Sequence, residues 1–224
     1  MVKGVVFDFD GLILDTELPV FRAWQEVFAE YEQELSLADW VDYIGRSPDS
    51  FDPCEDLERT LGRKLDRDRI RSEHRQREAK LIESEGVMPG VVDLIGQARK
   101  RNLHLGIASS SERAWVVRHL ERLGLVGAFE TIRCSDDVKR TKPEPDLYLA
   151  VIADWGIAAS EAIALEDSPH GVSAAKAAGM SCIAVPNEMT KSLSFDHADL
   201  VLPSLAGMSL DELLRKLGSD GVRP

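Results

Sequence analysis

The sequence has few cysteines, and their spacing excludes the common cysteine-based sites. Its 224 residues include three cysteines, Cys54, Cys134 and Cys182, and no two of them have the CxxC spacing of a zinc or redox motif. An odd number of widely separated cysteines does not suggest a disulfide framework. We expect each of them to be a small buried side chain in a protein of a reducing compartment.

Basic charge is also scarce relative to acidic charge. The formal net charge is −12, with 27 Lys and Arg against 39 Asp and Glu. A nucleic-acid-binding protein or a protein of the membrane surface would show a basic face, so we expect neither kind of partner. A small anionic substrate is still compatible with this charge, because a few local cations or a metal ion can outweigh a distant acidic surface.

No long apolar run is present, and no repeat or low-complexity segment interrupts the chain. None of the apolar segments approaches the ~20 residues that a membrane-spanning helix needs. Met1-Val2-Lys3 leads directly into the apolar segment that starts at Gly4, which leaves no room for a signal peptide. With 44% hydrophobic residues the chain can form an ordinary globular core, and we expect a cytoplasmic protein.

Short apolar segments alternate with segments of helical periodicity over most of the chain. The helical segments lie at 91–100, 112–123, 145–155 and 172–178, and a last helix follows Ser209. The apolar segments that predict strands are 2–9, 103–108, 131–134, 162–165, 181–185 and 199–202. This alternation predicts an α/β fold, a parallel sheet with helices on both faces.

One region, from Pro19 to about Ser84, has no strand pattern. Its clearest apolar residues are spaced three and four apart, as on one face of a helix: Phe21, Trp24, Val27 and Phe28. We therefore predict two domains. The α/β core would comprise residues 1–16 and 86–224, and an inserted all-helical domain would comprise residues 17–85.

Polar clusters lie at four points of the core segments, and three of them directly follow a predicted strand. In open α/β sheets such positions meet at the carboxyl edge, where ligands bind. Several carboxylates gathered there would repel one another unless a cation joined them. Oxygen ligands without histidine or thiolate favour a hard ion, Mg²⁺. The clusters are Asp8-Phe9-Asp10-Gly11, Ser109-Ser110-Ser111, Lys142-Pro143 and Glu166-Asp167.

These clusters resemble the motifs of a known family. The segment from Asp8 to Glu17, DFDGLILDTE, resembles the first motif of the haloacid dehalogenase superfamily in its phosphatase branch. Ser109 after LGIA resembles the second motif, Lys142 in TKPEPD the third, and Glu166-Asp167 in EDSPHG the fourth. The four motifs occur in the family's order and cover nearly the whole core. The resemblance implies a Rossmann-like core, and the helical insertion resembles the cap of the β-phosphoglucomutase-like group.

The resemblance also implies a role for each polar residue. Asp8 would attack phosphorus and form an aspartyl-phosphate, and Asp10 would act as general acid and base. Asp8, the backbone carbonyl of Asp10 and Asp167 would hold Mg²⁺, with Glu166 as a direct or an outer ligand.

Further residues would bind the phosphoryl group and the rest of the substrate. Ser109 and the adjacent backbone N–H at Ser110 would hold phosphoryl oxygens, and Lys142 would neutralise negative charge. In the helical insertion, Arg46 of Gly45-Arg46-Ser47 is the expected substrate contact. A run of Lys and Arg from Arg59 to Lys80 is interleaved with acidic residues, which is typical of a solvated helical surface.

The sequence thus predicts a magnesium-dependent phosphohydrolase acting on a small phosphomonoester, with a sugar phosphate as the expected class. Two alternatives stay open: a phosphomutase of the β-phosphoglucomutase type, and a catalytically idle regulator that binds a phosphorylated metabolite. A dehalogenase would use Asp8 without needing Asp10 or a metal ion. The mutase pattern has a histidine before the first cap helix, where this chain has Val20, and this difference favours hydrolysis. The sequence leaves the oligomeric state open.

Overall fold

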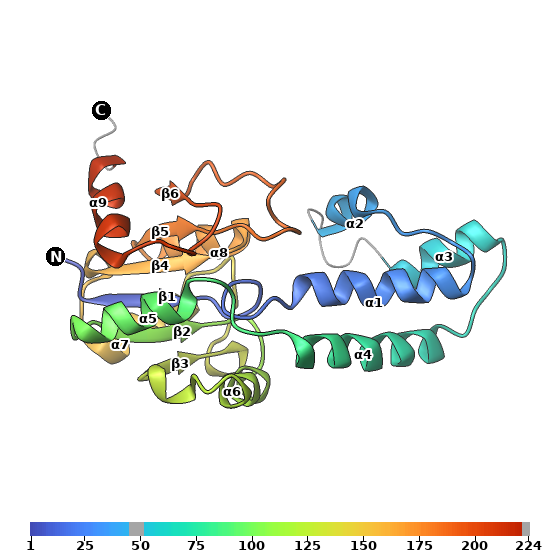
Figure 1. The fold of residues 1–224 in the computed structure, drawn as a ribbon, viewed down its shortest axis with the longest axis horizontal. Coiled ribbons are helices and arrows are strands. Elements are labelled where there is room, and N and C mark those ends of the chain that lie inside the picture. Colours follow the sequence, from blue (N-terminus) through green and yellow to red (C-terminus); the bar gives the residue numbers. More distant parts are fainter. Residues whose placement is uncertain (45–51, 221–224) are drawn as a thin grey trace. The chain divides into compact units, whose positions relative to one another are not determined.

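The described part of the chain, residues 1–44 and 52–220 of a computed structural model, contains a six-stranded sheet with the order β3-β2-β1-β4-β5-β6 (Figure 1). All neighbouring strands in it are parallel. The fold class expected from the sequence is confirmed. The strands are β1 (Gly4–Phe7), β2 (His104–Ala108), β3 (Thr131–Arg133), β4 (Ala162–Glu166), β5 (Ser181–Ala184) and β6 (Leu200–Val201).

The central strand β1 shows that both faces of the sheet are covered. Its four residues are all buried, although successive side chains of a strand point to opposite faces. Phe7 is level with Ile107 of β2 on one side and with Leu165 of β4 on the other. The residues that follow these three positions therefore lie side by side at the carboxyl edge of the sheet.

Helices α5, α7 and α8 pack against the strands, and α6 and α9 complete this part of the fold. The glycine at the end of α7, Gly156, adopts a left-handed conformation that ends the helix, and Ser168 caps the start of α8 by accepting from the Gly171 N–H. The helices are α5 (Val91–Lys100), α6 (Arg113–Arg122), α7 (Asp146–Trp155), α8 (Pro169–Ala177) and α9 (Leu210–Asp220).

Contacts divide the chain into two compact units. The first, here called the sheet unit, comprises Met1–Leu14, Gly86–Asn187 and the chain from Ser194 on. The second, the helical unit, comprises Asp15–Glu85 and Glu188–Leu193. Whether these units act as a catalytic core and a cap stays a prediction.

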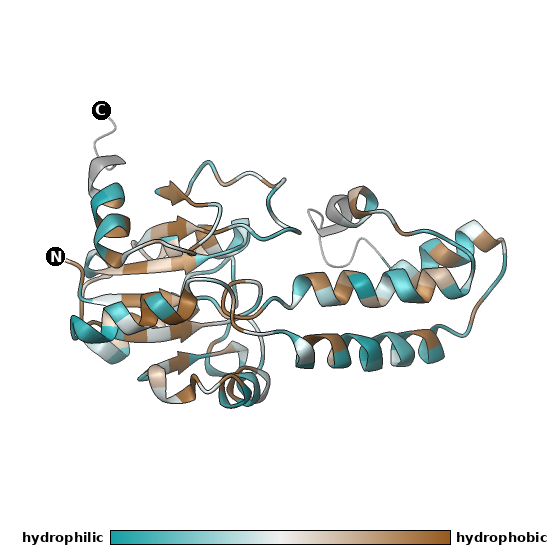
Figure 2. Ribbon diagram, viewed as in Figure 1, coloured by the Kyte–Doolittle hydropathy of each residue, from teal (hydrophilic) through white to brown (hydrophobic). Residues whose placement is uncertain are grey.

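The helical unit is built from four helices in the described residues, with α1 and α4 packed side by side (Figure 1). The four apolar residues whose spacing predicted a helix, Phe21, Trp24, Val27 and Phe28, are all buried in one cluster. Figure 2 shows α4 as mainly hydrophilic, whereas the strands of the sheet are mostly hydrophobic. The helices are α1 (Glu17–Glu30), α2 (Leu37–Ile44), α3 (Pro53–Leu61) and α4 (Arg67–Ser84).

A short segment far along the chain, Glu188–Leu193, belongs to the helical unit rather than to the sheet unit. Met189 is buried in the same apolar cluster as Phe21 and Trp24. No periodic pattern in the sequence predicts this association, because a single buried methionine in a loop has no helical or strand spacing.

The three cysteines are free and buried, as expected from their number and spacing. Burial raises the pKa of the Cys54 and Cys134 thiols to about 11, which keeps them protonated and unreactive near neutral pH.

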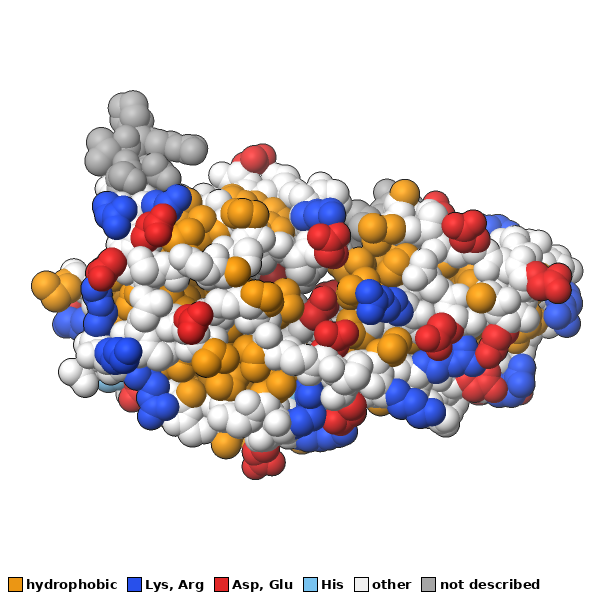
Figure 3. Space-filling view, viewed as in Figure 1, with side chains coloured by type: hydrophobic (Ala, Val, Ile, Leu, Met, Phe, Trp, Pro, Cys, Tyr) orange, Lys and Arg blue, Asp and Glu red, His pale blue; other side chains and the backbone are white. Residues whose placement is uncertain are grey.

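The surface of the helical unit shows Lys and Arg side chains interleaved with Asp and Glu (Figure 3). Several of the cations that the sequence placed on this unit are paired within it. The guanidinium groups of Arg67 and Arg71 lie 3.1 Å and 2.7 Å from the Asp52 carboxylate, and the Lys64 ammonium lies 2.9 Å from that of Glu58. Among the described helices none is long and apolar enough to cross a membrane.

Candidate active site

Three of the predicted polar clusters meet at the carboxyl edge of the sheet, around the ammonium group of Lys142. Its Nζ lies 2.6 Å from Asp8 Oδ1 and 2.6 Å from Glu166 Oε1. Asp8 follows β1 and Glu166 ends β4, so the aligned register of these strands brings the two carboxylates together. One carboxylate oxygen each from Asp8, Glu166 and Asp167 lie within 4.8 Å of one another.

This group of charges is almost fully enclosed. The Lys142 side chain is 6% exposed and that of Glu166 is not exposed at all. Burial alone would lower the pKa of Lys142, but the carboxylates of Asp8 and Glu166 outweigh that effect and raise it above its usual value. Lys142 is therefore a permanent cation between two carboxylates.

The carboxyl group of Asp8 is strongly affected by the same environment. Burial and the charge of Glu166 raise its pKa to about 7, although the nearby Lys142 acts in the opposite direction. The single positive charge of Lys142 does not balance the negative charges of three neighbouring carboxylates. An additional cation would stabilise the ionised form of Asp8.

Glu166 is fixed by hydrogen bonds to both of its oxygens. Oε1 accepts from the hydroxyl of Tyr148 as well as from Lys142, and Oε2 accepts from Ser168 Oγ at 3.3 Å. Gly171, in the first turn of α8, lies so close that any Cβ at this position would overlap the Glu166 carboxylate. The backbone of α8 thus forms one wall around Glu166.

Asp167 is held by a residue that the sequence did not single out. Asn187 donates from Nδ2 to Asp167 Oδ2 at 2.7 Å. Gly11 passes close to the same carboxylate with a φ of +79°, where a Cβ would collide with Asp167. The glycine of the first motif is therefore required both by its left-handed backbone and by the space that Asp167 occupies.

Asp10 lies beside the loop that follows β2, and three side chains donate to its carboxylate. Ser111 Oγ and Ser109 Oγ donate to Oδ2 at 2.7 Å and 3.3 Å. Trp115 donates from Nε1 to Oδ1 at 2.9 Å. The sequence predicted Asp10 and Ser109 as site residues, but Ser111 and Trp115 as partners of Asp10 were missed.

The loop 109–111 is itself anchored to neighbouring backbone. The Ser109 N–H donates to the Arg133 carbonyl at 2.9 Å, and the Ser135 N–H donates to the Ser111 carbonyl at 3.0 Å. None of these serines caps the following helix α6, whose N-cap residue is Glu112. Asp136 instead accepts from the Arg113 N–H at 2.9 Å, so the serine hydroxyls are available to the site.

The remaining predicted residues are placed as follows. Ser110 lies in the same loop with an exposed side chain. Arg46 lies outside the described residues. His170, which follows Pro169 in the fourth motif, is exposed at the start of α8.

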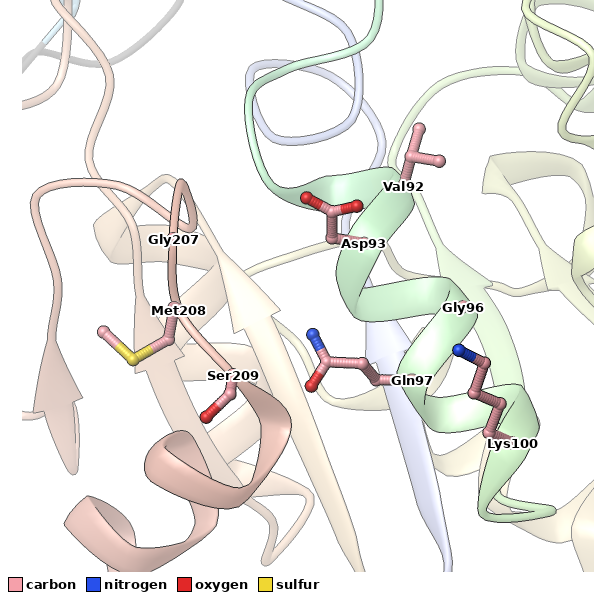
Figure 4. A pocket seen from close by; sticks show the side chains of 8 residues that line it. All are labelled: Val92, Asp93, Gly96, Gln97, Lys100, Gly207, Met208 and Ser209. Atoms are coloured by element: carbon pink, nitrogen blue, oxygen red, sulfur yellow. The ribbon is translucent and has the colours of Figure 1, made fainter.

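A pocket of about 350 Å³ lies elsewhere in the sheet unit, between α5 and the segment before α9 (Figure 4). It is lined among others by Val92, Gln97 and Met208, and it contains none of the predicted site residues. Gln97 uses its side-chain oxygen to accept from the Leu210 N–H, so this part of the pocket wall is structural.

The carboxylate group of Asp8, Glu166 and Asp167 could bind a metal ion. Its donors are all oxygens, they are buried, and they carry more negative charge than Lys142 balances. This combination suits a hard divalent cation.

Comparison with known proteins agrees with this geometry. Residues 5–185 match the family model of haloacid dehalogenase-like hydrolases. The chain is 43% identical over 219 residues to a Bacillus subtilis protein named "Putative phosphatase YhcW", covering 98% of this chain and 99% of that one. It is 26% identical to the Beta-phosphoglucomutase of the same organism, covering 95% and 94% of the two chains. A crystal structure of CbbY from Rhodobacter sphaeroides in complex with phosphate superposes with a TM-score of 0.71 at 27% identity, covering 95% and 99%. The chain belongs to the haloacid dehalogenase-like hydrolase family.

Proposed function

We propose that the protein is a magnesium-dependent phosphatase that hydrolyses a small phosphomonoester through an aspartyl-phosphate on Asp8. The observation that carries this proposal is the position of the Asp8 carboxylate. It lies at the end of β1 within 2.6 Å of the Lys142 cation, beside two further carboxylates and next to Asp10. A nucleophile, a charge-neutralising cation and a candidate acid–base residue are thus side by side.

In the first step, a carboxylate oxygen of Asp8 forms a bond to phosphorus while the bond between phosphorus and the ester oxygen breaks. Asp10 gives its proton to the departing oxygen, so that an alcohol leaves. Lys142 and the hydroxyl of Ser109 stabilise negative charge on the transferring phosphoryl group. The products are the alcohol, phosphorylated Asp8 and ionised Asp10.

In the second step, water attacks the same phosphorus atom. Asp10 takes a proton from the water as the new bond forms, and the bond between phosphorus and the Asp8 oxygen breaks. Inorganic phosphate leaves, and Asp8 and Asp10 return to their starting states. The cycle consumes one water for each ester.

Asp8, Asp167 and the backbone carbonyl of Asp10 would hold the magnesium ion. When bound, it supplies positive charge that offsets the crowded carboxylates and the phosphoryl oxygens. Both oxygens of Glu166 already accept hydrogen bonds, so we assign Glu166 to orienting Lys142 rather than to direct ligation.

Magnesium binding should release a proton from Asp8 under mildly acidic conditions. The pKa of Asp8 is raised to about 7 in the cation-free site, so this carboxyl group is largely protonated at pH 6 and ionised at pH 8.5. Because Mg²⁺ binds the ionised form, we expect release of up to about one proton per ion at pH 6 and almost none at pH 8.5. Titration calorimetry in buffers of different ionisation enthalpy measures this number. Asp8→Asn is the control, since it has no carboxyl proton at this position. The same proton release in that variant would contradict the assignment.

We propose a phosphorylated sugar as the substrate, since one relative is named a phosphoglucomutase and the solved CbbY contains phosphate. We further propose that the helical unit is the cap and that Arg46 contacts the substrate.

The phosphomutase remains the second candidate, because the Beta-phosphoglucomutase relative covers nearly the whole chain. Val20 stands where the mutase pattern has a histidine, which supports hydrolysis. We expected this position to precede the helix that carries Phe21, which was wrong: α1 starts at Glu17, and Val20 lies in its first turn.

Partition of the phosphoryl group distinguishes the two candidates. Purified protein with Mg²⁺ should release inorganic phosphate from members of a panel of small phosphomonoesters. Given a hexose 1-phosphate and its bisphosphate, it should release phosphate faster than it forms the isomeric 6-phosphate, because water reaches the aspartyl-phosphate directly. Isomer formation many times faster than phosphate release would overturn the proposal in favour of the mutase. Absence of turnover on the whole panel, with Mg²⁺ bound, would favour the idle regulator.

A further inference from the structure

We propose that Trp115, together with Ser111, is a positioning residue that fixes the carboxylate of Asp10 for acid–base catalysis. The inference rests on the proposed phosphatase function and adds to it two residues to which the sequence assigned no role. Neither side chain needs to touch the substrate. Each acts through its hydrogen bond to Asp10.

The hydrogen bonds to Asp10 come from two directions. Trp115 Nε1 donates to Oδ1 at 2.9 Å, and Ser111 Oγ donates to Oδ2 at 2.7 Å. A carboxylate held at both oxygens cannot rotate freely about its terminal bond, so its free lone pairs keep a fixed direction. Hydrogen bonds to a charged acceptor are also the stronger kind, so these two donors hold Asp10 most firmly in its ionised form, which takes a proton from water in the second step.

Both donors are held in place by their surroundings. Ser111 donates its backbone N–H to Ser109 Oγ at 3.0 Å and accepts from Ser135 through its carbonyl. The Trp115 ring, in the first turn of α6, meets the ring of the buried His119 edge-on, with centroids 4.3 Å apart. These contacts fix the indole before any substrate arrives.

All of these groups belong to the sheet unit, as Asp10 itself does. The orientation of the acid–base residue is therefore set by the unit that also carries Asp8. Asp10 needs no contact from the helical unit to reach a defined orientation. Such pre-orientation suits a hydrolase, in which water must be activated as soon as the aspartyl-phosphate has formed.

The test replaces Trp115 by phenylalanine, which keeps an aromatic ring and removes the N–H. With an ester of an unactivated alcohol, whose leaving group must be protonated, kcat should fall on the order of tenfold, as expected for loss of a hydrogen bond to a charged group. KM should stay within about twofold, because the phosphate ligands are intact. With p-nitrophenyl phosphate, whose leaving group needs little protonation, Asp8 should be phosphorylated at the normal rate. The phospho-enzyme should then accumulate, because water activation is slowed.

A matched control is available in the same unit. Trp155 also has a partly buried indole, which donates from Nε1 to Thr131 Oγ1 at 3.1 Å and stacks on the ring of His104. Trp155→Phe removes an indole hydrogen bond to a neutral hydroxyl away from Asp10 and should leave the kinetics unchanged. Ser111→Ala should act like Trp115→Phe, and Ser111→Thr, which keeps the hydroxyl, should restore most of the rate.

The outcomes separate this inference from the function on which it rests. A wild-type protein without turnover on any ester would defeat the proposed function. An active wild-type protein with unchanged or increased kcat in Trp115→Phe would overturn the positioning role alone. An equal loss in the rate of Asp8 phosphorylation for both kinds of ester, or an equal loss of kcat in Trp155→Phe, would indicate a structural effect and would overturn it as well.

Discussion

Asp8→Asn should reduce turnover to background and abolish any phospho-enzyme. An amide is a poor nucleophile, so the first step has no alternative route when the carboxylate is removed. The fold should survive, because Lys142 keeps Glu166 as a partner at 2.6 Å and the amide has nearly the shape of the carboxylate. Release of inorganic phosphate gives the rate, and mass spectrometry of acid-quenched protein detects the aspartyl-phosphate.

Asp15→Asn is the matched control for this variant. Asp15 lies in the same motif, but its Oδ1 accepts from the Leu18 N–H at 3.1 Å at the start of α1, a role that an asparagine can also fill. It should keep most of the activity. Substantial turnover by Asp8→Asn, in protein free of contaminating phosphatase, would refute the covalent mechanism.

Among the variants proposed here, Lys142→Met should lower the free energy of unfolding most, and it should also stop catalysis. Removal of this cation leaves Asp8 and Glu166 buried without the partner that lies 2.6 Å from each. Breaking a buried ion pair in this way costs about 3–5 kcal/mol of unfolding free energy. For a protein of this size the midpoint of thermal unfolding should fall on the order of 10 °C, measured by calorimetry at pH 8 without Mg²⁺. The deficit should shrink toward pH 5, because a proton on Asp8, whose pKa is already raised to about 7 by burial and by Glu166, removes one of the two charges.

Lys3→Met provides the comparison. Lys3 pairs with Glu161 at 2.7 Å in the same unit, but its side chain is 53% exposed, and such surface pairs contribute at most about 1 kcal/mol. If Lys142→Met were as stable as Lys3→Met at pH 8, the three buried charges could not form the tightly coupled group described above.

The fold was predictable because its strands are short, apolar and bounded by turn residues. The segment 162–165 was expected as a strand, and β4 spans Ala162–Glu166. The two-residue strand β6 lies within the expected segment 199–202. The family resemblance is confirmed by the match over residues 5–185. The limits of helices were less accurate: α8 starts at Pro169, whereas the apolar pattern suggested Val172, because proline and the following polar residues form the first turn without apolar spacing.

The residues at the strand ends could be proposed from the sequence, since parallel strands bring their carboxyl ends to one edge. Ser111 and Trp115 could not, because their relation to Asp10 depends on the path of the loop after β2. A tryptophan in an amphipathic helix is more simply read as a core residue. Asn187 and Tyr148 were missed for the same reason, since each lies far in the sequence from its partner in the site. Asn187 comes 20 residues after Asp167, and Tyr148 comes 18 residues before Glu166.

Gly171, in the first turn of α8, limits which substitutions could stabilise this protein. In a helix, glycine is less stable than alanine by up to about 1 kcal/mol, so helix propensity alone would make position 171 a target for stabilisation. The space beside it is occupied by the Glu166 carboxylate, and even a methyl group there would push that carboxylate away from Lys142. Helix α8 therefore carries a residue of low helix propensity at this position, because the buried Glu166 carboxylate occupies the space that a larger side chain would need. Because loss of the contact with Lys142 would cost more stability than the helix would gain, selection for heat resistance and selection for turnover would both be expected to retain this glycine.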